Sequence, residues 1–167
     1  IIAIDPRTSS VGHAFLMWTI AEYGDPGYLE YWDRLGPNLL TVSGGWSAAY
    51  NPFTAGEAPM VISYSTDTAY SVMYEESDRY QVLTPQGEGS RQIEGAGIIA
   101  GSDNVELAHA FLDYLLSVEV QSLIPTTNWM FPANEATPLP LAWQEHAVVP
   151  KNPVRLDPHV IEENEAR

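Results

Sequence analysis

The stretch IIAIDPRTSS at residues 1–10 decides the fold class, because it reads as a strand followed by a polar turn that begins a helix. Residues 1–4 are apolar, and the turn ends in hydroxyl side chains of the kind that cap helices. From residue 11 to about residue 23, apolar side chains recur at helical spacing. This order of strand, capped turn and helix is typical of α/β proteins.

The same alternation continues along the chain. Strands are predicted at residues 39–42 and 60–64, and the second is apolar enough to be buried on both faces. Helices are predicted at residues 27–35, 46–55 and 67–76, each following a turn or a capping sequence. The first half of the chain therefore predicts a parallel sheet flanked by helices.

Two further strands are predicted at residues 80–83 and 92–100, on either side of a loop at residues 84–91. Gly95 and Gly97 weaken the second of these strands, because glycine offers no side chain to pack. The chain thus keeps its α/β pattern up to about residue 100.

The clearest helix begins at residues 102–104, and its apolar stripe continues to about residue 124, where Pro125 stops it. Six prolines follow between Pro132 and Pro158, which predicts extended chain lying on another part of the protein. Residues 160–167 read as a helix that starts and then stops. The whole pattern predicts an α/β layer fold around a central, mostly parallel sheet flanked by helices.

The charge balance excludes one class of partner. The 167 residues contain 22 acidic and 7 basic side chains, so the formal net charge is −15, and Lys151 is the only lysine. Such a surface repels phosphate backbones, and we expect no nucleic-acid binding. It could attract a cationic ligand, but acids on solvated faces are the stronger explanation. The shortage of lysine suggests adaptation to high salt, where counter-ions screen self-repulsion.

The chain contains no cysteine, which excludes disulfides, thiolate nucleophiles and cysteine-based zinc sites. It also contains no apolar run near the roughly 20 residues that a membrane span requires. It begins without an initiator methionine or a signal peptide. We therefore expect a mature protein or an excised piece of one.

Enzyme signatures are missing. The sequence has no Walker A loop, no GxGxxG sequence and no GxSxG elbow. Its four histidines are scattered without the HxH or HExxH spacing of metal sites. A hydrolase or transferase would need a nucleophile–base pair, and none is visible. We predict no catalytic residue and no metal ligand.

Polar and aromatic residues gather where strands end. Residues 5–10, 43–46 and 64–70 each follow a predicted strand, and a fourth polar segment lies at residues 126–129. In open α/β sheets, ligands bind outside the carboxyl ends of the strands and near helix N-termini. These segments are the candidate binding site.

Within these segments, Trp46 and Trp129 suggest an aromatic box, which suits a flat or cationic ligand. Tyr64 and Tyr70 fit either this box or core packing with a hydroxyl at the rim. Ser9 lies at a helix N-terminus, where unpaired N–H groups favour anions and hydroxyls. Nearby Arg7 could contact an anionic ligand or form a salt bridge with one of the many acids.

Four strings carry a family resemblance: IDPRTSS at residues 4–10, GGWSAAY at 44–50, ISYSTDTAY at 62–70 and IPTTNWMFP at 124–132. In this order and at these intervals, they resemble thiamine-binding periplasmic proteins of ABC transporters. The match covers roughly residues 1–140. Iron- and polyamine-binding relatives share a turn like the first string, whereas all four strings with both tryptophans are more specific.

The resemblance implies one lobe of a type II periplasmic-binding-protein fold. Residues 1–132 would form the second, C-terminal ligand-binding lobe, and residues 133–167 a proline-rich tail that returns toward a first lobe absent from this sequence. The sequence departs from the family in two further ways. Val11 stands where a proline is common, and the final family helix is missing.

The resemblance also implies roles for individual residues. Trp46, Tyr64, Tyr70 and Trp129 would help to enclose the thiamine rings, and Ser9 would face the hydroxyethyl or phosphate end. Thiamine or a thiamine phosphate would be the transported ligand, with no cofactor and no catalysis.

The implied partners are an ABC transporter membrane permease and the missing N-terminal lobe. The implied location is the periplasm, or a secreted or cell-surface position, and the implied mechanism is hinge closure between lobes. The alternative is a related binding lobe for another small solute, namely an anion, an iron complex or a polyamine. An iron site would favour adjacent tyrosines, and the spacer between Tyr64 and Tyr70 argues against it.

Overall fold

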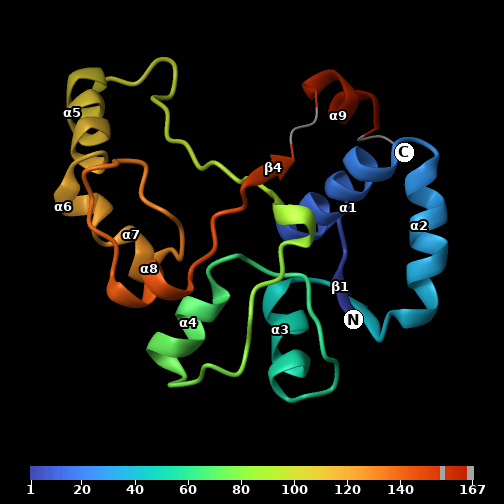
Figure 1. Ribbon diagram of the computed structural model, residues 1–167. Helices are drawn as coiled ribbons and strands as arrows, with labels where there is room; N and C mark the ends of the chain where they lie inside the picture. Colours follow the sequence, from blue (N-terminus) through green and yellow to red (C-terminus); the bar gives the residue numbers. More distant parts are fainter. Residues whose placement is uncertain (155–156, 165–167) are drawn as a thin grey trace. The chain divides into compact units, whose positions relative to one another are not determined.

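The chain forms two compact units in the computed structural model, which describes residues 1–154 and 157–164 (Figure 1). Unit 1 contains Ile1–Tyr64, Leu83–Arg91 and the described residues from Pro150 onward. Unit 2 contains Ser65–Val82 and Gln92–Val149. These boundaries differ from the predicted division at residues 132 and 133. That division concerns the lobes of a longer protein and stays a prediction.

The sheet of unit 1 is built around β1 (Ile2–Ile4), whose three residues are all buried. β1 pairs in parallel with β2 (Thr41–Ser43), with Ile2 opposite Thr41. Ile2 also forms a parallel bridge with Val61, through backbone hydrogen bonds to the two neighbours of Val61. The predicted parallel pairing is confirmed, while the strand predicted at residues 60–64 is reduced to this single bridge.

Helices flank this sheet as the sequence predicts. They are α1 (Ser10–Tyr23), α2 (Gly27–Leu35) and α3 (Trp46–Thr54), and the short 3₁₀ helix η1 (Gly36–Asn38) continues α2. α1 packs against α2 (Figure 1). The α/β class of the protein is therefore confirmed.

The core of unit 1 joins the strand to the helices on its flanks. Gly12 lets α1 approach the end of β1 closely, because a Cβ at this position would collide with the backbone of Ile4 and Asp5. The apolar side chains gather around β1, and Trp46 packs against them. The buried members are Ile2, Ile4, Val11, Ala49 and Ala58.

A second parallel pair in unit 1 joins β3 (Glu88–Ser90) to β4 (Asn152–Val154), with Glu88 opposite Asn152. The 3₁₀ helix η2 (Pro85–Gly87) precedes β3, and α9 (Pro158–Asn164) follows β4. α9 covers the described part of the helix predicted at residues 160–167, and residues 165–167 lie outside the described chain.

The strands predicted at residues 80–83 and 92–100 are wrong, since neither segment forms a strand. The second segment pairs with no strand in the described part of the chain, and both Ile93 and Ile99 are 82% exposed. A strand needs a hydrogen-bonded partner and a packed face, and this glycine-containing segment has neither.

Unit 2 is helical among its described residues. α4 (Asp67–Tyr74) is followed by α5 (Val105–Leu115), α6 (Val118–Gln121), α7 (Ile124–Thr127) and α8 (Leu141–His146). The prediction of purely extended chain between Pro132 and Pro158 is wrong, because α8 forms there and packs against α4. Pro140 precedes the first helical residue, where the missing N–H of proline costs nothing.

The helix α5 has apolar residues on its surface. None of its residues is buried, and Leu107 and Phe111 are 70% and 56% exposed. No single helix in the described chain is long and apolar enough to cross a membrane. α5 together with Val118–Thr127 meets the requirements of length and composition only as a pair bent by 54°.

Candidate ligand-binding site

The loops that follow β1 and β2 meet at the same edge of the sheet. The Thr8 hydroxyl donates a hydrogen bond to the Gly44 carbonyl at 2.9 Å, and the Asp5 backbone N–H donates to the Ser43 carbonyl at 2.9 Å. Two of the polar segments singled out in the sequence are thus joined. This meeting of loops at the carboxyl ends of parallel strands is where α/β folds place ligands.

Ser9 caps α1, as its position before the helical pattern predicts. Its backbone is extended, and its Oγ accepts a hydrogen bond from the Val11 N–H at 3.3 Å. A serine hydroxyl can donate one hydrogen bond as well as accept one, and this side chain is half-buried.

Arg7 forms an ion pair with Asp5. Its Nε and Nη2 donate to the two carboxylate oxygens of Asp5 at 3.0 and 2.7 Å, and its backbone N–H donates to the same carboxylate at 2.9 Å. These hydrogen bonds lower the pKa of Asp5 to about 2 and raise the pKa of Arg7. Arg7 therefore forms the salt bridge, and the loop carries a neutralised charge pair.

Trp46 is the first residue of α3 and is held from several directions. Its Nε1 donates to the Ser63 Oγ at 2.6 Å. Its ring stacks on the buried ring of Tyr50, with centroids 4.6 Å apart and planes 21° apart. Tyr64 lies 6.2 Å away at a tilt of 49°, and its side chain is 41% exposed. Trp46 and Tyr64 thus form an aromatic surface with its inner side anchored in unit 1.

In unit 2, Trp129 lies in a second cluster of aromatic rings. The Tyr70 ring meets it edge-on, with centroids 4.7 Å apart, and the Tyr74 ring does the same at 5.1 Å. Tyr70 and Tyr74 stack on each other at 5.6 Å. The buried Trp143 stacks on Trp129, with centroids 6.2 Å apart and planes 19° apart. The Trp129 ring therefore packs against three aromatic rings, those of Tyr70, Tyr74 and Trp143.

Each unit brings together some of the predicted site residues. Unit 1 holds Ser9, Trp46 and Tyr64, and unit 2 holds Tyr70 and Trp129. In each unit, one predicted tryptophan contacts one predicted tyrosine. Flat rings of this kind stack on heteroaromatic ligands and attract cations through their π faces.

Sequence reasoning missed several supporting side chains. Tyr50 and Tyr74 lie four residues after Trp46 and Tyr70 on their helices, so helical spacing could have found them. Trp143 comes from α8, inside the proline-rich stretch, and no sequence signal ties it to Trp129.

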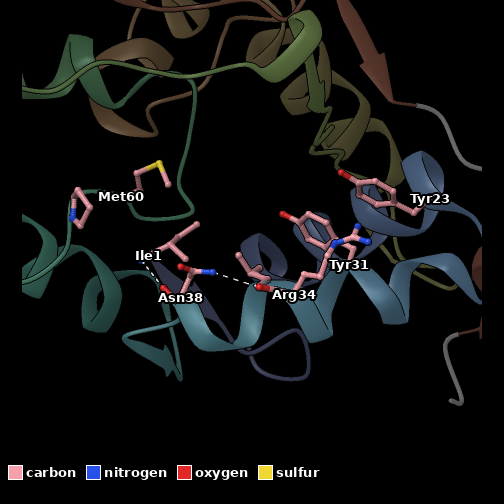
Figure 2. Close-up of a pocket in the computed structure, with 8 residues that line it drawn as sticks. Ile1, Tyr23, Tyr31, Arg34, Asn38 and Met60 are labelled. Atoms are coloured by element: carbon pink, nitrogen blue, oxygen red, sulfur yellow. Dashed lines mark hydrogen bonds between the residues drawn. The ribbon is translucent and has the colours of Figure 1, made fainter.

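A cavity in unit 1 is lined by other residues than those of the predicted site (Figure 2). It has a volume of about 570 Å³, and Met60 lies across it from the stacked rings of Tyr23 and Tyr31. Burial raises the pKa of the Tyr31 phenol, and the neighbouring Tyr23 adds to this rise. None of the predicted site residues lines this cavity, and its few polar groups offer little to orient a ligand.

The described residues also give no indication of a metal centre. In residues 1–154 and 157–164, no group of three or more histidine, aspartate or glutamate side chains is placed to hold a metal ion.

Comparison with known proteins agrees with this geometry. Residues 12–122 match the family described as bacterial extracellular solute-binding protein. A thiamine-binding periplasmic protein of Brucella abortus biovar 1 (strain 9-941) is 39% identical over 98% of this chain and 49% of its own length. The thiamine-binding periplasmic protein of Escherichia coli (strain K12) is 38% identical over 87% of this chain and 44% of its own length.

A solved structure shows the same fold. A periplasmic thiamin binding protein, 34% identical in sequence, superposes with a TM-score of 0.86 over 99% of this chain and 51% of its own. This likeness confirms the predicted periplasmic-binding-protein fold. The chain spans about half the length of the curated relatives it matches. With its matched residues, its fold and its aromatic surfaces in agreement, the chain belongs to the bacterial extracellular solute-binding protein family.

Proposed function

We propose that this chain carries the aromatic part of a thiamine-binding site in a periplasmic solute-binding protein that serves an ABC importer. The supporting observation is that Trp46 with Tyr64, and Trp129 with Tyr70, are paired in a chain closely related to proteins named for thiamine binding. The family is one of solute binding rather than catalysis, so no reaction is assigned. The names of the relatives support thiamine or its phosphate as the transported ligand.

The chemistry of thiamine suits these surfaces. Thiamine has a flat pyrimidine ring and a permanently cationic thiazolium ring, and both stack favourably on tryptophan and tyrosine. A net charge of −15 also raises the local concentration of a cationic solute. Ser9 offers a hydroxyl donor to the hydroxyethyl or phosphate end of the ligand.

The rest of the proposed mechanism involves a second lobe. Since the relatives are about twice as long, we propose that another lobe encloses the ligand from the opposite side by hinge closure. The closed form is then recognised by a membrane permease. This sequence of steps places the protein in the periplasm or on the cell surface.

Tryptophan fluorescence titrated with thiamine tests the proposal. Saturable quenching is expected, with an affinity on the order of millimolar for this chain alone, because an open half-site lacks enclosure. Trp46→Ala should abolish most of the quenching. Trp32→Phe is the matched control, because Trp32 bonds to Thr19 in the α1–α2 region and should leave the titration unchanged.

Parallel titrations with spermidine, ferric citrate and phosphate test the related solute classes. Quenching by one of these probes, with none by thiamine or thiamine phosphate, would contradict the proposal and assign the site to that solute. Equal quenching of wild type and Trp46→Ala by thiamine would show that the site lies elsewhere.

A further inference from the structure

Trp129 has a backbone conformation that most residues avoid. Its φ is +56°, in the left-handed region, where the Cβ of an L-residue is crowded by its own backbone. The adjoining rings and side chains must therefore favour this conformation over the ordinary one. Such a position is maintained when the direction of the side chain matters, and two neighbours in unit 2 supply the necessary contacts.

The first neighbour is Thr66, which is only 5% exposed. Its hydroxyl donates a hydrogen bond to the Trp129 carbonyl at 3.1 Å. Thr66 stands at the N-cap of α4, where threonine usually accepts a bond from the helix, but its side chain makes no capping bond. The Thr66 hydroxyl thus bonds to the Trp129 carbonyl and does not cap the helix. Since the Tyr70 N–H donates to the Thr66 carbonyl, the same residue ties Trp129 to the helix that carries Tyr70.

The second neighbour is Trp143, which is 1% exposed. It stacks on Trp129 and meets Phe131 edge-on, with centroids 5.1 Å apart. Its Nε1 has no hydrogen-bond partner among the described residues. The contacts that Trp143 makes with Trp129 and Phe131 are therefore contacts of its ring.

We propose that Thr66 and Trp143 are positioning residues that fix the orientation of the Trp129 ring for stacking on the ligand. Thr66 holds the backbone of Trp129 through its carbonyl, and Trp143 supports the ring. The inference rests on the proposed function for the identity of the ligand, while the positioning itself is independent of it. Neither residue needs to touch the ligand.

Fluorine NMR of the full chain labelled with 5-fluorotryptophan tests the positioning directly. The five tryptophans give five resonances, and Trp129→Phe identifies the one from Trp129. Thr66→Val keeps the side-chain shape but removes the hydroxyl, and it should shift or broaden the Trp129 resonance. Thr66→Ser should restore it. Unchanged Trp129 resonances in Thr66→Val and in Trp143→Phe would overturn the proposal.

The matched control is Thr19→Val. Thr19 is also fully buried, and its Oγ accepts a hydrogen bond from the Trp32 Nε1 at 3.0 Å. This variant should shift the Trp32 resonance and leave that of Trp129 in place. If the Trp129 resonance also shifts in Thr19→Val, it responds to a general loosening of the protein. That result would count against a specific role for Thr66.

Titration with thiamine then connects the positioning to binding. Thr66→Val should weaken thiamine binding about tenfold, which corresponds to the loss of one buried hydrogen bond, and Thr66→Ser should bind like the wild type. A moved Trp129 resonance with unchanged thiamine affinity would overturn the role in binding. If the wild type itself binds no thiamine, the proposed function fails, whereas the fluorine spectra still decide whether Thr66 and Trp143 hold Trp129.

Discussion

Trp46 and Trp129 are the same kind of side chain, held by different means. Trp46 begins a regular helix, bonds through its indole N–H to Ser63 and packs against the core around β1. Trp129 lies in an irregular segment with a left-handed backbone, and its contacts are one carbonyl hydrogen bond and a set of rings. The first depends on the packing of unit 1 as a whole, and the second depends on a few individual side chains.

This difference predicts two patterns of sensitivity. Changes that disturb the β1–α1 packing should affect Trp46 together with the stability of unit 1. Changes at single positions in unit 2 should displace Trp129 at a smaller cost in stability. The following variants test this contrast, from the largest expected effect to the smallest.

Gly12→Ala should have the largest effect. The added Cβ would collide with the backbone of Ile4 and Asp5, which cannot move without opening the contact between α1 and β1. We expect a loss of about 3 kcal/mol in the free energy of unfolding, measured by urea denaturation. Gly36→Ala is the control, because its Cβ would meet nothing within 4 Å and its backbone is helical. Equal losses for both variants would contradict the close-packing argument.

Thr66→Val should lower the free energy of unfolding by about 1–2 kcal/mol, because it leaves the Trp129 carbonyl without its donor. Thr127→Val is a suitable comparison. Thr127 is exposed and donates to the Leu123 carbonyl at 2.7 Å, so water can replace its hydroxyl and the loss should be near zero. If both variants lose the same stability, the bond to Trp129 is no stronger than a surface contact.

Ser63→Ala should cost about 1 kcal/mol or less in unfolding free energy, because core packing continues to hold the Trp46 ring. The fluorine resonance of Trp46 should move less in this variant than the Trp129 resonance moves in Thr66→Val. A larger displacement of Trp46 would remove the distinction between the two sites, since both would then depend on a single hydrogen bond.

The Asp5–Arg7 pair should have the smallest effect. Because the pKa of Asp5 is lowered in the folded chain, its contribution to stability is present above the ordinary aspartate pKa and is lost as the pH falls toward about 2. Carbon NMR of the Asp5 carboxyl should show titration near pH 2. In Arg7→Gln the pKa should rise toward its usual range, and an unchanged value would mean that Arg7 is not its cause.

Local features of the sequence predict the part of the fold around β1. The apolar run, the capping serine and the helical spacing after it depend on neighbouring residues, and all three are present where expected. The same holds for the placement of Trp46 at a helix start after glycine. In both cases the sequence signals that carry the prediction lie within a few positions along the chain.

Other features depend on partners that are distant in the sequence. Residues 92–100 have strand-like composition but pair with no strand among the described residues, while the short segment Glu88–Ser90 becomes a strand because Asn152–Val154 lies next to it. The hydrogen bond from Thr66 to Trp129 and the stacking of Trp143 likewise join distant residues. Neither periodicity nor capping signals carry this information. The contacts of Thr66 and Trp143 with Trp129 are therefore not predictable from the sequence.

The pairing of β3 with β4 has a consequence for synthesis on the ribosome. Glu88 emerges about 64 residues before its partner Asn152, which at 5–20 residues per second is a delay of roughly 3–13 s. During that time β3 has an unsatisfied edge that other strands could join. The nascent chain must therefore produce the whole segment Gln92–Val149 before unit 1 can close, and translation speed through that segment sets how long the edge stays open.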